Sequence, residues 1–232
     1  EEHVKRVINL TPRVEELRKV SSSKIVLVVG NELSIDTTGI LPGTSYVERI
    51  AAIKTWNSEH DARLNSYLNE LIDEVRKRFG GFITYAAGSW ENVEWGRPNI
   101  DIVGPNRYVY STQSAKNYAL RKLIHYKKYD KPVWVNEFGC KSYVGASRQE
   151  PYTGQPYSQE EQANNIRESL DFFKEVGGID AAFLHTFIIK FPYDESLPNN
   201  ADNSYNIMKY LSGNFMKRKL GAYLYTSFKI RN

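Results

Sequence analysis

Two patterns of hydrophobic and polar positions follow one another along the chain. Short, continuous apolar runs that stop at a polar residue or glycine are typical of buried strands. They predict strands at residues 25–29, 82–87, 100–103, 133–135 and 181–187. Apolar positions at helical spacing predict helices at residues 2–20, with a kink or restart near Pro12, and at 45–79, 115–129, 158–176 and 205–228.

The alternation of these strands and helices indicates a parallel α/β fold. The connection between strands 82–87 and 100–103 is too short for a full helix, so we expect a turn or a brief 3₁₀ segment there. Residues 33–44 and 141–157 are predicted loops, and a loop as long as the second is usually functional. A chain of 232 residues is large enough for one well-buried domain, so we expect a single α/β domain over residues 1–232.

Two of the predicted strands end in the same dipeptide, Asn-Glu. The first is Lys24-Ile-Val-Leu-Val-Val-Gly-Asn-Glu32, and the second is Lys131-Pro-Val-Trp-Val-Asn-Glu137. Functional groups gather at the C-terminal ends of the strands in parallel α/β folds. The other predicted strand ends also carry polar or aromatic side chains: Trp90, Asn106, Tyr108 and His185. The sequence therefore predicts a site at this edge, centred on Glu32 and Glu137.

Two carboxyl groups among amides and aromatic rings suit glycoside hydrolysis. One must be protonated to assist the leaving group, and the other must be ionised to attack the anomeric carbon or activate water. Asn31 could hydrogen-bond a sugar 2-hydroxyl, and Tyr108 could steady the ionised carboxylate. Each glutamate taken alone also fits an ordinary loop or helix-cap acid, and it is the pair that favours catalysis. Trp90, Tyr108 and His185 are open between packing and sugar contact.

Other acids and composition narrow the choice of function. Asp36 and Glu91 are interpreted as loop acids, and the single Cys140, expected to be inert, excludes an internal disulfide and a cysteine-based zinc site. The four histidines form no paired metal motif, which disfavours a metal-dependent hydrolase. A net charge of +4 without a basic run argues against nucleic acid, and the lack of a glycine-rich phosphate loop argues against a nucleotide-binding sheet.

Neither a membrane span nor a cellular location can be read from the chain. No apolar run approaches the length needed to cross a membrane. No signal peptide is visible, but the first residue is Glu rather than Met, so the native start can have been removed and the location stays open between cytoplasmic and secreted.

Three motifs resemble retaining glycoside hydrolases of the large (β/α)8 clan. In that clan the acid/base follows an Asn on strand four and the nucleophile ends strand seven, as in Gly30-Asn-Glu32 and Pro132-Val-Trp-Val-Asn-Glu-Phe-Gly139. The segment Asp101-Ile-Val-Gly-Pro-Asn-Arg-Tyr108 is similar to strand six, whose tyrosine contacts the nucleophile. Residues 85–95, 137–140 and 182–187 look closest to a glycosidase-like group labelled abortive phage infection proteins. The resemblance implies a TIM-barrel fold, Glu32 as acid/base, Glu137 as nucleophile, and no cofactor.

The resemblance covers nearly the whole chain but only the C-terminal part of a barrel, strands four to eight. A truncated sequence, a split gene whose other piece completes the barrel, and an association of fragments all stay open. On the last strand, His185 and Phe187 stand where many members of the clan place a tryptophan. We expect a retaining glycosidase acting on a β-linked glycoside or polysaccharide. The alternative is a non-catalytic carbohydrate-binding or phage-resistance interaction protein derived from such a barrel.

Overall fold

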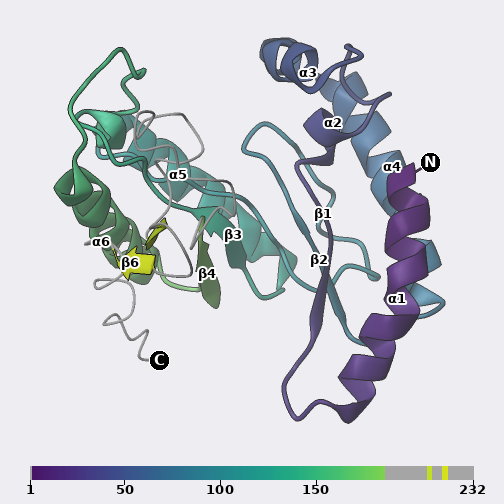
Figure 1. Cartoon of the computed structure of the whole chain (residues 1–232). Coiled ribbons are helices and arrows are strands. Elements are labelled where there is room, and N and C mark those ends of the chain that lie inside the picture. The colour runs from purple at the N-terminus through teal and green to yellow at the C-terminus, as the bar shows by residue number, and fades with distance from the viewer. Residues whose placement is uncertain (1, 186–207, 211–215, 219–232) are drawn as a thin grey trace. The chain divides into compact units, whose positions relative to one another are not determined.

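The computed structural model describes residues 2–185, 208–210 and 216–218 (Figure 1). Contacts divide the chain into two compact units, which we describe separately. The first unit comprises Glu1–Asn106 and Tyr129–Trp134, and the second comprises Arg107–Lys128 and Val135–Asn232. The expectation of one domain over residues 1–232 stays a prediction.

The helices of the first unit agree in part with those predicted. Helix α1 (Glu2–Val20) runs through Pro12 without a restart, and it packs along α4 (Ser58–Arg76) (Figure 1). The predicted helix 45–79 is divided into α3 (Tyr46–Ala52), η1 (Ile53–Thr55) and α4. The division falls at Asn57, whose side chain accepts hydrogen bonds from the N–H groups of Glu59 and His60 and so starts a new helix.

Strands β1 (Val26–Asn31) and β2 (Phe82–Ala86) form the regular sheet of the first unit. They pair in parallel, as predicted, with Val26 opposite Phe82. The predicted strand 100–103 is not a regular strand, but parallel bridges join Pro105 to Ala87 and Val103 to Val133. Residues 87–100 hold turns and no helix, as expected for so short a connection. The predicted loop 33–44 contains a short helix, α2 (Leu33–Asp36).

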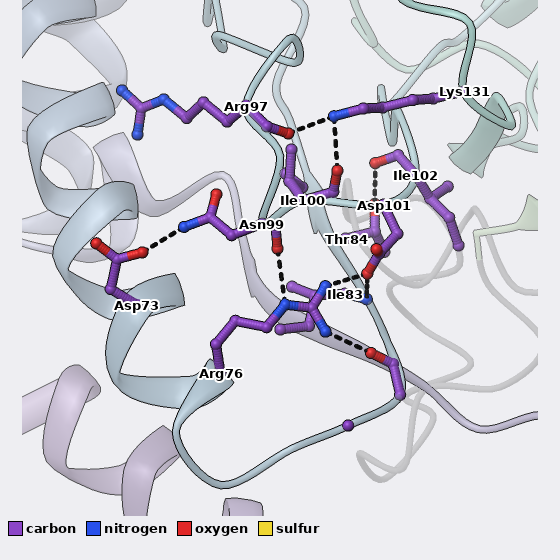
Figure 2. A network of polar contacts seen from close by, with 12 residues as sticks. Asp73, Arg76, Ile83, Thr84, Arg97, Asn99, Ile100, Asp101, Ile102 and Lys131 are labelled. Atoms are coloured by element: carbon purple, nitrogen blue, oxygen red, sulfur yellow. Dashed lines mark hydrogen bonds and ion pairs between the residues drawn. The ribbon is translucent and has the colours of Figure 1, made fainter.

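A network of polar contacts fixes the 99–102 stretch to β2 and α4 (Figure 2). The backbone N–H of Asp101 donates to the carbonyl of Ile83 (3.0 Å), and the carboxylate of Asp101 accepts from the N–H of Ile83 (2.7 Å) and from Arg76. Arg76 also donates to the carbonyls of Asn99 and Gly81. These bonds take the place of a longer strand ladder, and they fix the start of the segment that ends at Asn106.

The second unit joins two helices to a pair of strands. Strand β3 (Trp134–Phe138), which begins in the first unit, neighbours β4 (Ala181–Leu184). Helix α5 (Gln113–Tyr126), extended by the 3₁₀ turn η2 (Lys127–Tyr129), and helix α6 (Gln159–Val176) contact each other. Phe138 of β3 packs edge-on against Phe173 of α6, with ring centroids 5.4 Å apart. Residues 186 and 187 of the predicted strand 181–187 lie outside the described residues.

The start of α6 matches half of the predicted capping box. The side chain of Ser158 accepts a hydrogen bond from the N–H of Glu161 at 3.0 Å, as expected. The Glu161 carboxylate does not return a bond to Ser158 but accepts from the N–H of Ser147 at 3.0 Å. Ser147 belongs to η3 (Ala146–Arg148), a 3₁₀ turn inside the predicted loop 141–157. The hydrogen bond to Glu161 therefore attaches this loop to the start of α6.

The predicted C-terminal helix 205–228 is wrong where the structure describes the chain. Residues Met208–Tyr210 form β5 and Met216–Arg218 form β6, and the two strands pair antiparallel. The rest of 205–228 lies outside the described residues.

Candidate active site

Glu137 lies near the end of β3 in a cluster that belongs to the second unit. Its Oε2 accepts a hydrogen bond from the hydroxyl of Tyr108 at 2.8 Å. The same oxygen lies 3.8 Å from Nδ1 of His185, an ion pair when the imidazole is protonated. The ring of Tyr108 meets His185 edge-on, with centroids 6.4 Å apart. The structure thus brings together three of the predicted site residues.

Backbone hydrogen bonds explain why these side chains meet. The N–H of Arg107 donates to the carbonyl of Glu137 at 2.7 Å, which places Tyr108 beside the carboxylate. On the other side, the N–H of His185 donates to the carbonyl of Phe138, also at 2.7 Å. The Glu137 side chain keeps 19% of its surface exposed, so a ligand can reach it.

Glu32 directly follows β1 and belongs to the first unit. Its N–H donates to the carbonyl of Ala86 at 2.9 Å, which continues the pairing of β1 with β2. Its backbone then turns into the left-handed region, with φ 45° and ψ 44°. A residue with a side chain is rarely found there, because the conformation costs about 1–3 kcal/mol and persists only where the surroundings enforce it.

The amide of Asn106 joins Glu32 to Asn31. Its Nδ2 lies 2.9 Å from both Oε1 of Glu32 and Oδ1 of Asn31, and it donates to both. Asn106 is buried, and its own N–H donates to the carbonyl of Ala87 at 2.7 Å. Three further predicted site residues therefore form one cluster. The contact of Asn31 and Asn106 with a substrate stays a prediction.

Glu91 lies in a loop, as interpreted from the sequence, but its side chain is buried and hydrogen-bonded. Burial raises the pKa of its carboxyl group. The carboxylate accepts hydrogen bonds from the hydroxyl of Tyr85 (2.8 Å) and from the N–H groups of Gly88 (2.8 Å) and Ser34 (3.2 Å). Sequence reasoning misses Glu91 because its partner Ser34 is 57 residues away, and no local pattern marks such a burial. Asp36, the other expected loop acid, is the last residue of α2.

Trp90 is fixed to the same cluster. Its Nε1 donates to the hydroxyl of Ser34 at 3.0 Å, and its indole lies against Gly88. A Cβ atom on Gly88 would come within 2.7 Å of the indole ring, so only glycine permits this contact. These contacts explain the position of Trp90, whereas stacking of its ring on a sugar stays a prediction.

Other candidate chemistry in the described part of the chain is limited. Burial, together with the nearby carboxylates of Glu161 and Glu168, raises the pKa of the Cys140 thiol to about 12, which fits the expectation of an inert cysteine. Among residues 2–185, 208–210 and 216–218, no group of three or more His, Cys, Asp or Glu side chains could hold a metal ion. None of the described helices has the length and apolar character of a membrane span.

Comparison with known proteins gives one family and a set of related folds. A family model described as Glycoside Hydrolase Family 113 matches residues 57–208. No match was found among the curated proteins. The fold is similar to a solved GH113 β-1,4-mannanase, with a TM-score of 0.54, 19% identity, and 78% of this chain and 51% of that chain covered.

Two further solved structures extend the comparison. The GH113 β-mannanase of Alicyclobacillus acidocaldarius has a TM-score of 0.51 and 16% identity, with 88% of this chain and 57% of that chain covered. The β-glucuronidase of Bifidobacterium dentium has a TM-score of 0.61 and 14% identity, with 95% and 32% covered. The chain thus spans about half the length of these mannanases and about a third of the glucuronidase. At these identities the likeness concerns the fold alone: mixed α/β, with no closed barrel among the described strands.

Proposed function

Because the chain belongs to glycoside hydrolase family 113, we propose that it carries both catalytic carboxyl groups of a retaining glycoside hydrolase that acts on β-linked glycosides. Glu137 is the nucleophile and Glu32 is the acid/base. The observation that carries the proposal is the 2.8 Å hydrogen bond from Tyr108 to Glu137 at the end of β3. The resemblance to the glycosidase clan implies this contact, because the tyrosine of strand six contacts the nucleophile in that clan.

The surroundings of Glu137 suit a nucleophile. The Tyr108 hydroxyl donates to its Oε2, and Nδ1 of His185 lies 3.8 Å from the same oxygen. In the first step the carboxylate attacks the anomeric carbon and forms a covalent glycosyl-enzyme, while the bond to the leaving oxygen breaks. The Tyr108 hydroxyl holds the attacking group in position during this step.

Glu32 supplies the proton in the proposed mechanism. In the first step its carboxyl group protonates the leaving oxygen, and in the second its carboxylate takes a proton from the water that releases the sugar. The amide of Asn106 donates to Oε1 of Glu32 and so orients the carboxyl group. The mechanism requires both carboxyl groups to reach one glycosidic bond at a separation of about 5–5.5 Å, and an experimental structure with a bound substrate analogue can measure this.

Substitution of the two acids tests the proposal. Glu137→Gln should lose nearly all turnover, because an amide cannot form the glycosyl-enzyme. Glu32→Gln should lose most activity on substrates with poor leaving groups and least on activated aryl glycosides, which need little protonation. Glu150→Gln is the matched control, since Glu150 pairs with Arg148 in the loop that follows β3. Wild-type turnover in Glu137→Gln would end the hypothesis.

A β-1,4-linked mannan is the first substrate to test, because two of the similar structures are β-mannanases. A β-glucuronide is the second, on the likeness to the β-glucuronidase fold. The narrower resemblance to the abortive phage infection group has no support among these similarities and stays a prediction.

We also propose that the strands correspond to strands four to eight of a TIM barrel, which a further fragment or subunit completes. Within the described residues, β1 pairs only with β2, and Val28 of β1 is 46% exposed. An open strand edge with exposed apolar side chains favours pairing with another strand. Amide hydrogen exchange in Val26–Asn31 would test this, because a partner along the free edge would slow exchange there.

A non-catalytic interaction protein is the second candidate, and the absence of a closed barrel among the described strands favours it. Such a protein would bind β-linked oligosaccharide without cleaving it, and Glu137→Gln would leave the affinity unchanged. Isothermal titration with and without product analysis separates the two functions.

A further inference from the structure

Glu32 holds the N-cap position of α2, yet its side chain makes no capping hydrogen bond. Ser, Thr, Asp or Asn at this position accepts from the N–H groups two or three residues further on. Here other residues take the first two N–H groups of the helix. The N–H of Leu33 donates to the hydroxyl of Tyr85 at 2.8 Å, and the N–H of Ser34 donates to Oε1 of Glu91 at 3.2 Å.

Tyr85 and Glu91 act as one buried unit. The Tyr85 hydroxyl accepts from Leu33 and donates to Oε2 of Glu91 at 2.8 Å. The same oxygen of Glu91 accepts from the N–H of Gly88 at 2.8 Å. Tyr85 is fully buried and Glu91 is 5% exposed. A buried carboxyl group is costly unless hydrogen bonds satisfy it, as those from the N–H groups of Ser34 and Gly88 and from the Tyr85 hydroxyl do here.

We propose that Tyr85 and Glu91 are positioning residues for Glu32. Their bonds to the N–H groups of Leu33 and Ser34 hold Glu32 in its left-handed conformation, in which its carboxyl group accepts the hydrogen bond from Asn106. The inference rests on the proposed role of Glu32 as acid/base. Neither residue touches the reacting atoms: both act through the backbone that follows Glu32.

The leaving group of the substrate reveals whether this positioning matters. A displaced carboxyl group protonates the leaving oxygen poorly, so substrates with poor leaving groups suffer most. Activated aryl glycosides depart with little help and suffer least. The ratio kcat/KM reports the glycosylation step alone, so it isolates this effect from the later role of Glu32 as a base.

The experiment compares Tyr85→Phe and Glu91→Gln with the unchanged protein. Two substrates are used: a β-mannoside with a dinitrophenyl leaving group, and an unsubstituted β-1,4-linked mannooligosaccharide. For both variants we expect kcat/KM to fall roughly 10- to 100-fold on the oligosaccharide and only a few-fold on the aryl glycoside. Tyr143→Phe is the matched control, because it removes another buried hydroxyl, which donates to the carbonyl of Glu150 at 2.6 Å. It should leave the ratio between the two substrates unchanged.

Equal losses on both substrates would overturn the inference, because they would indicate a merely structural role. If Glu91→Gln does not fold, Tyr85→Phe decides alone. If the unchanged protein cleaves neither these two substrates nor the corresponding β-glucuronides, or if Glu32→Gln keeps the activity of the unchanged protein, the proposed function has failed. Crystal structures of Tyr85→Phe then judge the positioning by itself. Departure of Glu32 from its φ of 45° would support the inference, and retention of that φ with the bond to Asn106 would overturn it.

Discussion

Replacement of Lys131 by methionine tests how far the first unit depends on one ammonium group. Nζ of Lys131 donates to three backbone carbonyls: Trp95 (2.6 Å), Arg97 (2.5 Å) and Ile100 (2.7 Å); the last two contacts appear in Figure 2. These carbonyls lie in the segment between β2 and Asp101, where the structure has turns and no helix. The ammonium group therefore replaces the hydrogen bonds that regular secondary structure would give this segment.

The size of the effect follows from these contacts. A hydrogen bond to a charged group contributes about 1.5–3 kcal/mol, so three set an upper bound of about 4.5–9 kcal/mol. Two terms reduce this. Burial lowers the pKa of Lys131 despite the charge of Asp101, so desolvation of the ammonium opposes the gain. Water can also reach the freed carbonyls, because Lys131 is only half-buried. We expect Lys131→Met to lower the free energy of unfolding by about 2–4 kcal/mol.

Urea unfolding followed by tryptophan fluorescence measures this loss. All four tryptophans lie in the first unit, so the signal reports on the unit that contains Lys131. Lys77→Met is the control, because Lys77 lies in the same unit and its exposed ammonium pairs only with the carboxylate of Glu74 among the described contacts. An exposed pair of this kind contributes little. If Lys131→Met costs no more than Lys77→Met at an unchanged m-value, the reasoning is refuted.

Two further predictions concern buried titratable groups. Because the pKa of Cys140 is raised to about 12, the folded chain should resist a thiol reagent at mildly alkaline pH and react only in denaturant; labelling of the native chain at the rate of a free cysteine would contradict this. Burial raises the pKa of Glu91 above the 4.5 of an ordinary glutamate, so between these pKa values the native state binds more protons than the unfolded chain. The contribution of protonated Glu91 to the free energy of unfolding is therefore full below pH 4.5 and is lost as pH rises through the native pKa. The loss of stability caused by Glu91→Gln should shrink over the same pH range. If urea unfolding gave the same loss at every pH, the prediction would be contradicted.

The sequence predicts the parts of the structure that local pattern determines. The apolar runs before Glu32 and Glu137 correspond to β1 and β3, and the strand-end rule brings Tyr108 and His185 to Glu137. At Asn57 the sequence carries a signal for the start of a helix, but the helical spacing of the apolar residues around it obscures that signal. Asn57 and His60 satisfy a capping box, yet apolar positions continue on both sides of it, so the pattern predicts one helix.

Residues that depend on distant partners could not be predicted. Tyr85 and Leu33 are 52 residues apart in the sequence, and the bond between them forms only because β1 and β2 pair in parallel. Asn106 reaches Glu32 across 74 residues. Neither pattern nor composition marks such pairs, because burial of a polar side chain is decided by tertiary packing.

The left-handed backbone of Glu32 shows how such distant contacts define a site. The conformation costs about 1–3 kcal/mol and persists only where the surroundings enforce it. Three bonds enforce it here: from Glu32 to the carbonyl of Ala86, from Leu33 to Tyr85, and from Ser34 to Glu91. All three acceptors lie in residues 85–91, where the strand-end rule selects Trp90 alone. An Asn-Glu dipeptide grafted onto the end of another strand, without the equivalents of Tyr85 and Glu91, should therefore relax from this conformation.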